Sequence, residues 1–178
     1  FEFPSLPKGR FNSVCFVYRD SLYVFGGTDN SSNMNEIVRY DLSTQNSGEW
    51  TTIAKVNEAN QRGGVAFVVE DKVYAGLGEK SSGIRNGFYV SSDSLTKWEL
   101  IPSIPAQLGV ISSGVYDEQK KSFFMIDNDG KIWEYNLTTA QWTSRSLWIR
   151  MKNYHMFMLD GSIYILGQDI YQKNKFTV

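Results

Sequence analysis

Short runs rich in β-branched and aromatic residues, separated by polar residues, follow one another along the whole chain. Gly, Asn, Asp and Ser bound these runs, as is typical of turns between strands. No segment of about a dozen residues has the spacing of apolar positions that an amphipathic helix requires. The pattern therefore predicts an all-β protein built from many short strands.

One eight-residue stretch, Asp20–Gly27, combines a turn, a buried strand and a pair of glycines. Its glycines suit a strand end where φ turns positive or another backbone passes closely. Similar stretches follow at 71–78, 121–127 and 160–167, with anchoring aromatic residues at Tyr23, Tyr74, Phe123 and Tyr164. Such recurrence at a regular interval indicates an internal repeat.

A tryptophan accompanies this stretch in the first three units, at Trp50, Trp98 and Trp142. Each of these units has four strand-like runs: one before the repeated stretch, the stretch itself, and one on either side of the tryptophan. Two independent landmarks thus share a period of about 40 to 50 residues. We expect one domain over residues 1–178, with units at approximately 8–53, 61–105, 109–146 and 150–178, and a further strand in 1–7.

The first unit resembles the kelch repeat of propellers related to the central domain of galactose oxidase. The resemblance rests on Arg10, the stretch Asp20–Gly27, the pair Tyr40-Asp41 and the closing Trp50. In the second unit, residues 91–98 are similar to the Asp-box hairpin of sialidase-like propellers, with Leu95 where that motif has glycine. The resemblance implies an all-β, kelch-type β-propeller with four blade units, the fourth incomplete.

The sequence suggests two ways in which a ring of blades could be completed. Residues 1–7 resemble the outer strand and exit of the second unit, at 98–105, so they could complete the fourth unit. Alternatively, further blades follow in a longer polypeptide, and we favour this second interpretation. An array of blades that does not close leaves apolar faces and strand edges exposed.

Composition narrows the classes of partner. The formal net charge of −1 gives no electrostatic basis for binding nucleic acid or an anionic membrane. The single cysteine, Cys15, cannot form a disulfide within the chain. No apolar run approaches the roughly 18 residues of a membrane-spanning helix. The family resemblance, which is greatest to bacterial envelope proteins with kelch-like blades, suggests an extracytoplasmic location.

Residues able to hold a metal or carry out catalysis are scarce. His155 is the only histidine, so the copper site of galactose oxidase, with two histidines and a modified tyrosine, is not expected here. Asp127-Asn-Asp129-Gly130 has some likeness to a calcium loop, but it lacks the later ligands and is predicted to be a hairpin turn. We therefore predict no catalytic residue, no metal ligand and no cofactor.

Candidate ligand-binding residues lie in the loops that lead into the first strand of each unit. In a kelch ring these loops open on one face around the axis, and arginine suits the recognition of carboxylates or other anions there. The same residues could instead form a solvated rim that has no ligand. The predicted site comprises Arg10, Asn12, Gln61, Arg62, Arg150, Asn153 and Tyr154.

Three functions remain open from the sequence. The first is a non-catalytic binding module that presents a polar propeller face to a protein or glycan. The second is a carbohydrate-active enzyme of the sialic-acid epimerase or sialidase type, which would need carboxylates beside the arginines. The third is a structural spacer without a ligand. We place the binding module first because no acidic residue is compellingly positioned for catalysis.

Overall fold

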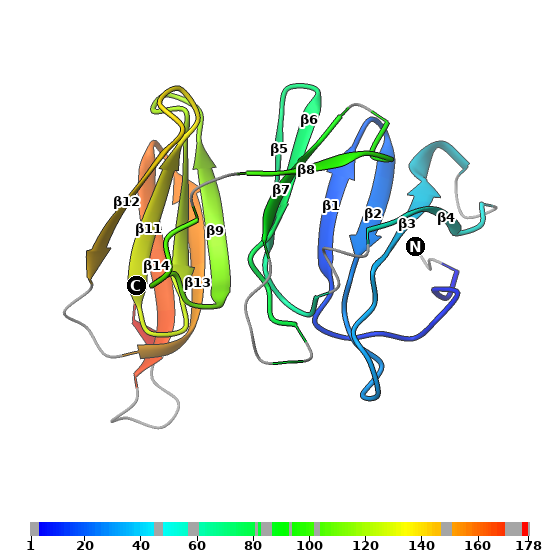
Figure 1. Ribbon diagram of the computed structural model, residues 1–178, viewed down its shortest axis with the longest axis horizontal. Helices are drawn as coiled ribbons and strands as arrows, with labels where there is room; N and C mark the ends of the chain where they lie inside the picture. Colours follow the sequence, from blue (N-terminus) through cyan, green and yellow to red (C-terminus); the bar gives the residue numbers. More distant parts are fainter. Residues whose placement is uncertain are drawn as a thin grey trace. The chain divides into compact units, whose positions relative to one another are not determined.

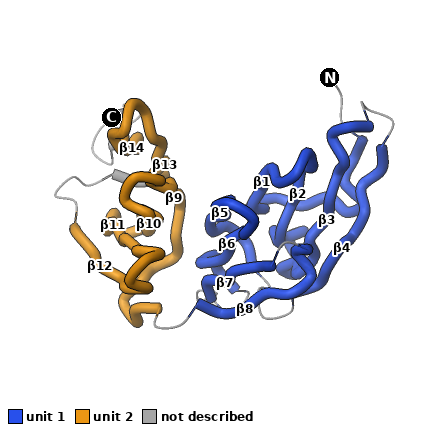
Figure 2. The backbone as a smooth tube through the Cα atoms, turned by 90° about the horizontal axis from the view of Figure 1, so that it is seen from above, with its two compact units in different colours: residues 1–101 blue, residues 102–178 orange. Residues whose placement is uncertain are grey.

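Antiparallel sheets make up the protein, as the computed structural model shows (Figure 1). The structure describes residues 4–44, 48–56, 61–80, 82, 87–92, 94–101, 104–146, 151–169 and 176–177. Within these ranges the one helical element is a short 3-10 turn, η1, at Leu42–Thr44. The prediction of an all-β fold is confirmed. The chain forms two compact units, Phe1–Ile101 and Pro102–Val178 (Figure 2).

The first unit contains two four-stranded sheets, blade 1 and blade 2. Blade 1 has the order β1-β2-β3-β4, with β1 at Val14–Tyr18, β2 at Ser21–Phe25, β3 at Glu36–Asp41 and β4 at Thr51–Lys55. Blade 2 has the order β5-β6-β7-β8, with β5 at Val65–Val69, β6 at Lys72–Gly76, β7 at Phe88–Ser91 and β8 at Trp98–Leu100. Both sheets match the four strands expected of each repeat.

The second unit contains blade 3 and blade 4. Blade 3 consists of β9 at Ile111–Asp117, β10 at Ser122–Asp127, β11 at Lys131–Asn136 and β12 at Gln141–Ser146. Blade 4 consists of β13 at Met151–Leu159, β14 at Ser162–Asp169 and β15 at Phe176–Thr177. β15 pairs directly with β14 and therefore takes the third position in blade 4.

The core of the first unit lies between blade 1 and blade 2. Side chains alternate along β1, so Phe16 and Tyr18 are buried while Cys15 and Val17 are exposed on the opposite face. The rings of Phe16 and Tyr23, which are cross-strand neighbours, stack at 5.2 Å. They share a core cluster with Val73 and Ala75 of blade 2, both fully buried. Burial of these apolar faces holds the two sheets together.

The core of the second unit lies between blade 3 and blade 4. Ile126 of β10 packs with Tyr154 and Met156 of β13. The backbone N–H of Met156 also donates a hydrogen bond of 2.9 Å to the hydroxyl oxygen of Ser113. In both units, the face of the second strand that carries Phe25 in blade 1 and Ile126 in blade 3 therefore packs against the next blade.

The structure corrects the alignment of the third repeat by one residue. Ser21 pairs with Asp41 in blade 1, and Ser122 pairs with Asn136 in blade 3, so the equivalent of Tyr23 is Phe124 and not Phe123. The reason is the turn before the strand, which spans four residues at 118–121 but only two in blade 1.

The predicted hairpin turn after β10 is confirmed. One oxygen of Asp127, Oδ1, accepts hydrogen bonds from the backbone N–H groups of Asp129 and Lys131 at 3.0 and 2.9 Å. Its other oxygen accepts a hydrogen bond of 2.8 Å from the indole of Trp133. Gly130 closes the turn at a φ of 77°. The Asp127 carboxylate therefore stabilises the turn between β10 and β11.

Candidate functional site

Four loops meet at one end of the first unit, and together they form what we call the loop platform: residues 8–13, 26–35, 61–64 and 77–80. Phe11 and Thr28 exchange two backbone hydrogen bonds of 3.0 Å, which join the first two loops. The backbone N–H of Gly63 donates a bond of 2.6 Å to the carbonyl of Asn12. This links the loops that precede the first strands of blades 1 and 2.

Further bonds fix the two blades to each other at the same end. The N–H of Gly27 donates to the carbonyl of Gln61 at 2.8 Å, and the side-chain amide of Asn33 donates to the carbonyl of Glu79 at 2.9 Å. Within blade 2, Arg62 and Glu79 exchange two backbone hydrogen bonds. The platform is therefore held by backbone as well as side-chain contacts, which limits the conformations of its loops.

Arg10 lies beneath the surface of this platform. Its side chain is 1% exposed, and its guanidinium donates to the carbonyl of Gly26 at 3.3 Å and to the carboxylate of Glu36 at 3.2 Å. These two bonds tie the loop before β1 to the glycine pair and to the start of β3. Arg10 thus stabilises the loops that carry the surface.

Gln61 and Asn12 support the platform in different ways. Gln61 is fully buried, and its side-chain oxygen accepts a hydrogen bond of 3.2 Å from the N–H of Gly78. Asn12 is exposed and adopts a positive φ of 52°, a conformation that asparagine tolerates better than most residues. Both residues shape the loops before the first strands.

Arg62 is the predicted arginine that the structure places at the platform surface, where its side chain is 44% exposed. Its Nε and Nη2 atoms donate to the same carboxylate oxygen of Glu79, at 3.0 and 2.7 Å. The platform has two further ion pairs, Lys8 with Asp29 at 2.6 Å and Arg10 with Glu36. Each of these cations is therefore matched by a carboxylate of the chain itself.

Phe11 is the platform residue that sequence reasoning missed. Its ring is 46% exposed, although the bonds to Thr28 fix its backbone. The available signal was an aromatic residue between Arg10 and Asn12, in a loop of otherwise polar or small residues. An exposed aromatic side chain on a backbone that is held in place is suited to contact a partner.

The neighbouring loop at 28–33 is also well ordered by local bonds. Asp29 accepts hydrogen bonds from the backbone of Ser31 and Ser32, each at 3.0 Å. Its pKa lies well below the usual range, chiefly because of Lys8 and the Ser31 hydroxyl, with the backbone bonds adding to the effect. The Asp29 carboxylate therefore remains charged at neutral pH and holds this loop in a turn.

The other predicted site residues belong to the second unit. Asn153 is exposed at an irregularity in β13, and its amide donates a hydrogen bond of 3.3 Å to Gln168. Tyr154 is buried, with its ring against Gly130. Arg150 lies outside the described residues. The structure thus brings Arg10, Asn12, Gln61 and Arg62 together in the first unit, and places Asn153 and Tyr154 in the second.

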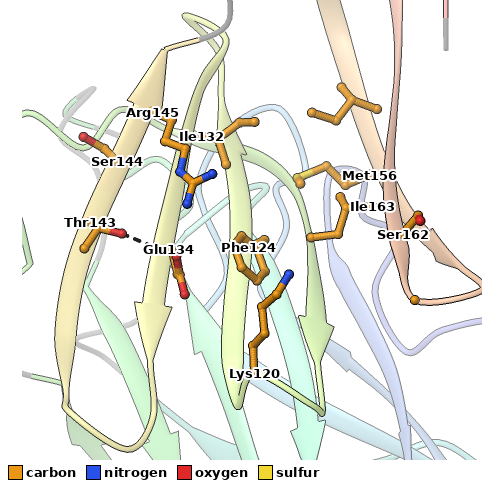
Figure 3. Close-up of a pocket in the computed structure, with 12 residues that line it drawn as sticks. Lys120, Phe124, Ile132, Glu134, Thr143, Ser144, Arg145, Met156, Ser162 and Ile163 are labelled. Carbon is orange, nitrogen blue, oxygen red and sulfur yellow. Dashed lines mark hydrogen bonds between the residues drawn. The ribbon is translucent and has the colours of Figure 1, made fainter.

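A pocket of about 350 Å³ lies between blade 3 and blade 4. Phe124 and Ile132 form its wall on blade 3, opposite Met156 and Ile163, with Lys120 and Arg145 over the blade 3 side (Figure 3). In the first unit, the ring of Trp98 of blade 2 stacks on Phe25 of blade 1. The pocket is therefore a gap in the packing between two blades, lined with both apolar and charged groups.

Two charged groups of this pocket, Glu134 and Lys120, have partners within blade 3. Glu134 accepts a hydrogen bond of 2.9 Å from the Ser122 hydroxyl, and Lys120 lies 3.2 Å from the carboxylate of Asp117.

Within the described ranges, no cluster of three or more His, Cys, Asp or Glu side chains has a geometry that could hold a metal ion. None of the described helical segments is of a length and apolarity that would cross a membrane.

Comparison with known families identifies the repeat of blade 1. Residues 9–57, which contain all four strands of this blade, match the Kelch motif. A search of curated proteins finds no match to the chain. Repeats of this kind commonly mediate protein interactions. Blade 1 is therefore a kelch repeat, and the antiparallel sheets of the chain fit a kelch-type β-propeller.

Proposed function

We propose that the chain is a protein-binding module and that its contact surface is the loop platform, with Phe11 and Arg62 as the principal contact residues. The observation that supports this proposal most directly is the exposed ring of Phe11 on a backbone held by two hydrogen bonds. Aromatic and arginine side chains dominate the energy of many protein interfaces. A contact residue that is already ordered loses less conformational entropy when it binds.

The charges of the platform indicate how a partner would bind. Each cation in these ion pairs is matched by a carboxylate, so the pairs add no net positive charge to the surface. The surface therefore offers little long-range attraction for a strongly acidic ligand. The partner would instead supply an apolar pocket for Phe11 and a carboxylate or carbonyl that competes with Glu79 for Arg62. Such a combination of a buried aromatic ring and a peripheral polar contact is typical of protein interfaces.

A protein partner is favoured over a sialic-acid-like sugar by the state of the arginines. Recognition of a sugar carboxylate requires guanidinium groups that are open to the ligand. Arg10 is buried against Glu36, and Arg62 is paired with Glu79. The kelch motif of blade 1 also points toward protein interaction.

The proposal can be tested by placing a photo-crosslinking amino acid at position 12, beside Phe11, and identifying the proteins that become attached. The affinity of a purified partner is then measured by calorimetry for the wild type and for Phe11→Ala and Arg62→Ala. We expect Phe11→Ala to weaken binding by about 2 kcal/mol, or roughly 30-fold, as for a typical hot-spot residue. Arg62→Ala should weaken binding as well.

Leu100→Ala provides the matched control, because Leu100 is an exposed apolar residue on β8, outside the platform. This variant should bind as tightly as the wild type. Unchanged affinity in Phe11→Ala, with its fold intact by circular dichroism, would contradict the proposed surface. A glycan array in parallel would favour a sugar partner if it gave binding that depends on Arg62.

A further inference from the structure

The pocket between blade 3 and blade 4 is lined by residues of the second unit alone, whereas the loop platform belongs to the first. Its volume of about 350 Å³ lies within the range of roughly 300–1,000 Å³ that is typical of small-molecule sites. A ligand of this pocket would therefore be distinct from a partner of the platform, and the two sites can be tested separately.

Apolar side chains form the inner part of the pocket. The most deeply buried of its lining residues is Met156, which is 8% exposed and packs with Ile126 and Tyr154. The walls on either side of it, which Figure 3 shows facing each other across the pocket, are made of partly buried apolar side chains: Phe124, Ile132, Ile163 and Ile165. This inner part is suited to a short alkyl chain or a single aromatic ring.

The blade 3 wall changes from apolar to charged toward its outer strand. Ile126 of β10 pairs with Ile132 of β11, and Ile132 pairs in turn with Arg145 of β12. Residues directly opposite each other in neighbouring strands have their side chains on the same face of the sheet. Arg145 therefore extends from β12 on the face that lines the pocket (Figure 3).

The equivalent position in blade 1 is apolar. There Phe25 pairs with Ile37, and Ile37 pairs with Ala54, which packs against the core between blade 1 and blade 2. Packing of one blade on the next thus uses a small apolar residue at this place in the first repeat. The third repeat has the guanidinium of Arg145 there, beside an open pocket.

Arg145 is also the pocket cation whose charge is not matched by a carboxylate. In the part of the chain that the structure describes, no hydrogen bond or ion pair joins it to another residue. Lys120, by contrast, lies 3.2 Å from Asp117, and its Nζ atom is 5.2 Å from the centroid of the Phe124 ring. The pocket therefore combines an apolar interior with a guanidinium that has no anionic partner.

We propose that this pocket binds a small amphipathic anion, namely a carboxylate attached to a short alkyl chain or an aromatic ring. The apolar part contacts Met156 and Phe124, and the carboxylate binds Arg145, whose planar guanidinium can donate two parallel hydrogen bonds to it. Lys120, beside Phe124, adds a second positive charge near the bound anion. The apolar walls strengthen these contacts, because charges attract each other more strongly where less water surrounds them.

The charge of the ligand is tested by titrating the full chain with octanoate, octanamide and octylamine in a calorimeter. The three compounds share an alkyl chain and differ in the charge of the head group. Octanoate should bind roughly tenfold more tightly than octanamide, as expected when a hydrogen bond to a charged group is lost. Equal affinities for these two compounds would overturn the proposal. Preferred binding of octylamine would overturn it as well, because Glu134 would then be the charged group that binds the ligand.

Replacement of the arginine tests its role directly. Arg145→Gln should weaken octanoate binding about tenfold and leave octanamide binding unchanged. Arg19→Gln is the matched control, because Arg19 is an exposed arginine of the first unit that pairs with Asp71, and this variant should bind octanoate like the wild type. Reduced stability of Arg145→Gln with unchanged octanoate affinity would show that the arginine only covers the apolar wall, which contradicts the proposal.

Met156 reports whether the ligand enters the pocket. Its methyl resonance should shift when octanoate binds, whereas that of Met34, a buried methionine of the first unit, should not. Ile163→Trp should fill the pocket and abolish octanoate binding, and Ile163→Phe serves the same purpose if circular dichroism shows that the first variant does not fold. An unchanged Met156 resonance at saturating octanoate would place the binding site elsewhere, and the absence of any octanoate binding would also overturn the proposal.

Discussion

At the scale of single residues, the two glycines that end β2 are constrained in ways that the sequence motif anticipates. Gly27 has a φ of 93°, and a Cβ added there would lie 3.0 Å from the carbonyl oxygen of Phe11. We expect Gly27→Ala to lower the free energy of unfolding by on the order of 3 kcal/mol, through backbone strain together with overpacking. Urea denaturation followed by tryptophan fluorescence measures this loss.

Gly63 offers a matched control for that substitution. It also has a positive φ, 67°, but an added Cβ would have no atom within 4 Å. Gly63→Ala should therefore cost only about 1 kcal/mol, the penalty of the left-handed conformation alone. Equal losses in the two variants would show that the close approach of Phe11 does not matter.

The two arginines of the loop platform should respond differently to replacement. Arg10 is buried and bonded to Glu36 and Gly26, so Arg10→Ala should lower stability by about 2 kcal/mol through the loss of these hydrogen bonds. Arg62→Ala should cost less than about 1 kcal/mol, because both side chains of its ion pair with Glu79 are partly exposed to solvent. Thermal and urea unfolding of both variants would test this; similar losses would contradict the assigned burial.

At the scale of secondary-structure elements, the sequence predicted the strands well and their exact alignment less well. Runs of β-branched and aromatic residues between turn residues identified the four strands of each of the first three repeats, because such side chains pack well on a pleated sheet. The alignment of Phe124 with Tyr23 could not be read from the sequence, since it depends on the length of the turn at 118–121. The burial of Arg10 was likewise hidden, because it results from contacts with β3, which begins 26 residues later at Glu36.

The turn between β9 and β10 should make the second unit sensitive to acid. Asp117 accepts a hydrogen bond of 3.0 Å from the backbone N–H of Lys120, which lowers its pKa, and the Lys120 side chain lowers it further. Its contribution to stability is therefore complete above the ordinary aspartate pKa of about 3.9 and is lost as pH falls through the lower, folded-state pKa.

Replacing either partner in this turn tests the acid sensitivity. In Asp117→Asn, urea midpoints measured from about pH 7 down to pH 2.5 should decline less steeply than in the wild type, because the titrating group is gone. Lys120→Ala should keep most of the decline, since the backbone N–H remains and is the larger cause of the lowered pKa. An unchanged decline in Asp117→Asn would exclude Asp117 as a source of the acid sensitivity.

At the scale of the whole molecule, the repeat pattern predicted the kind of architecture but not which apolar faces find a neighbour. Phe16–Tyr23 and Phe157–Tyr164 look alike in sequence, yet one pair is buried and the other is exposed. Exposure depends on whether another sheet lies against the pair, and a single repeat does not contain that information. The predicted binding residues were similarly divided, since packing placed Arg62 at a surface and Gln61 in the interior.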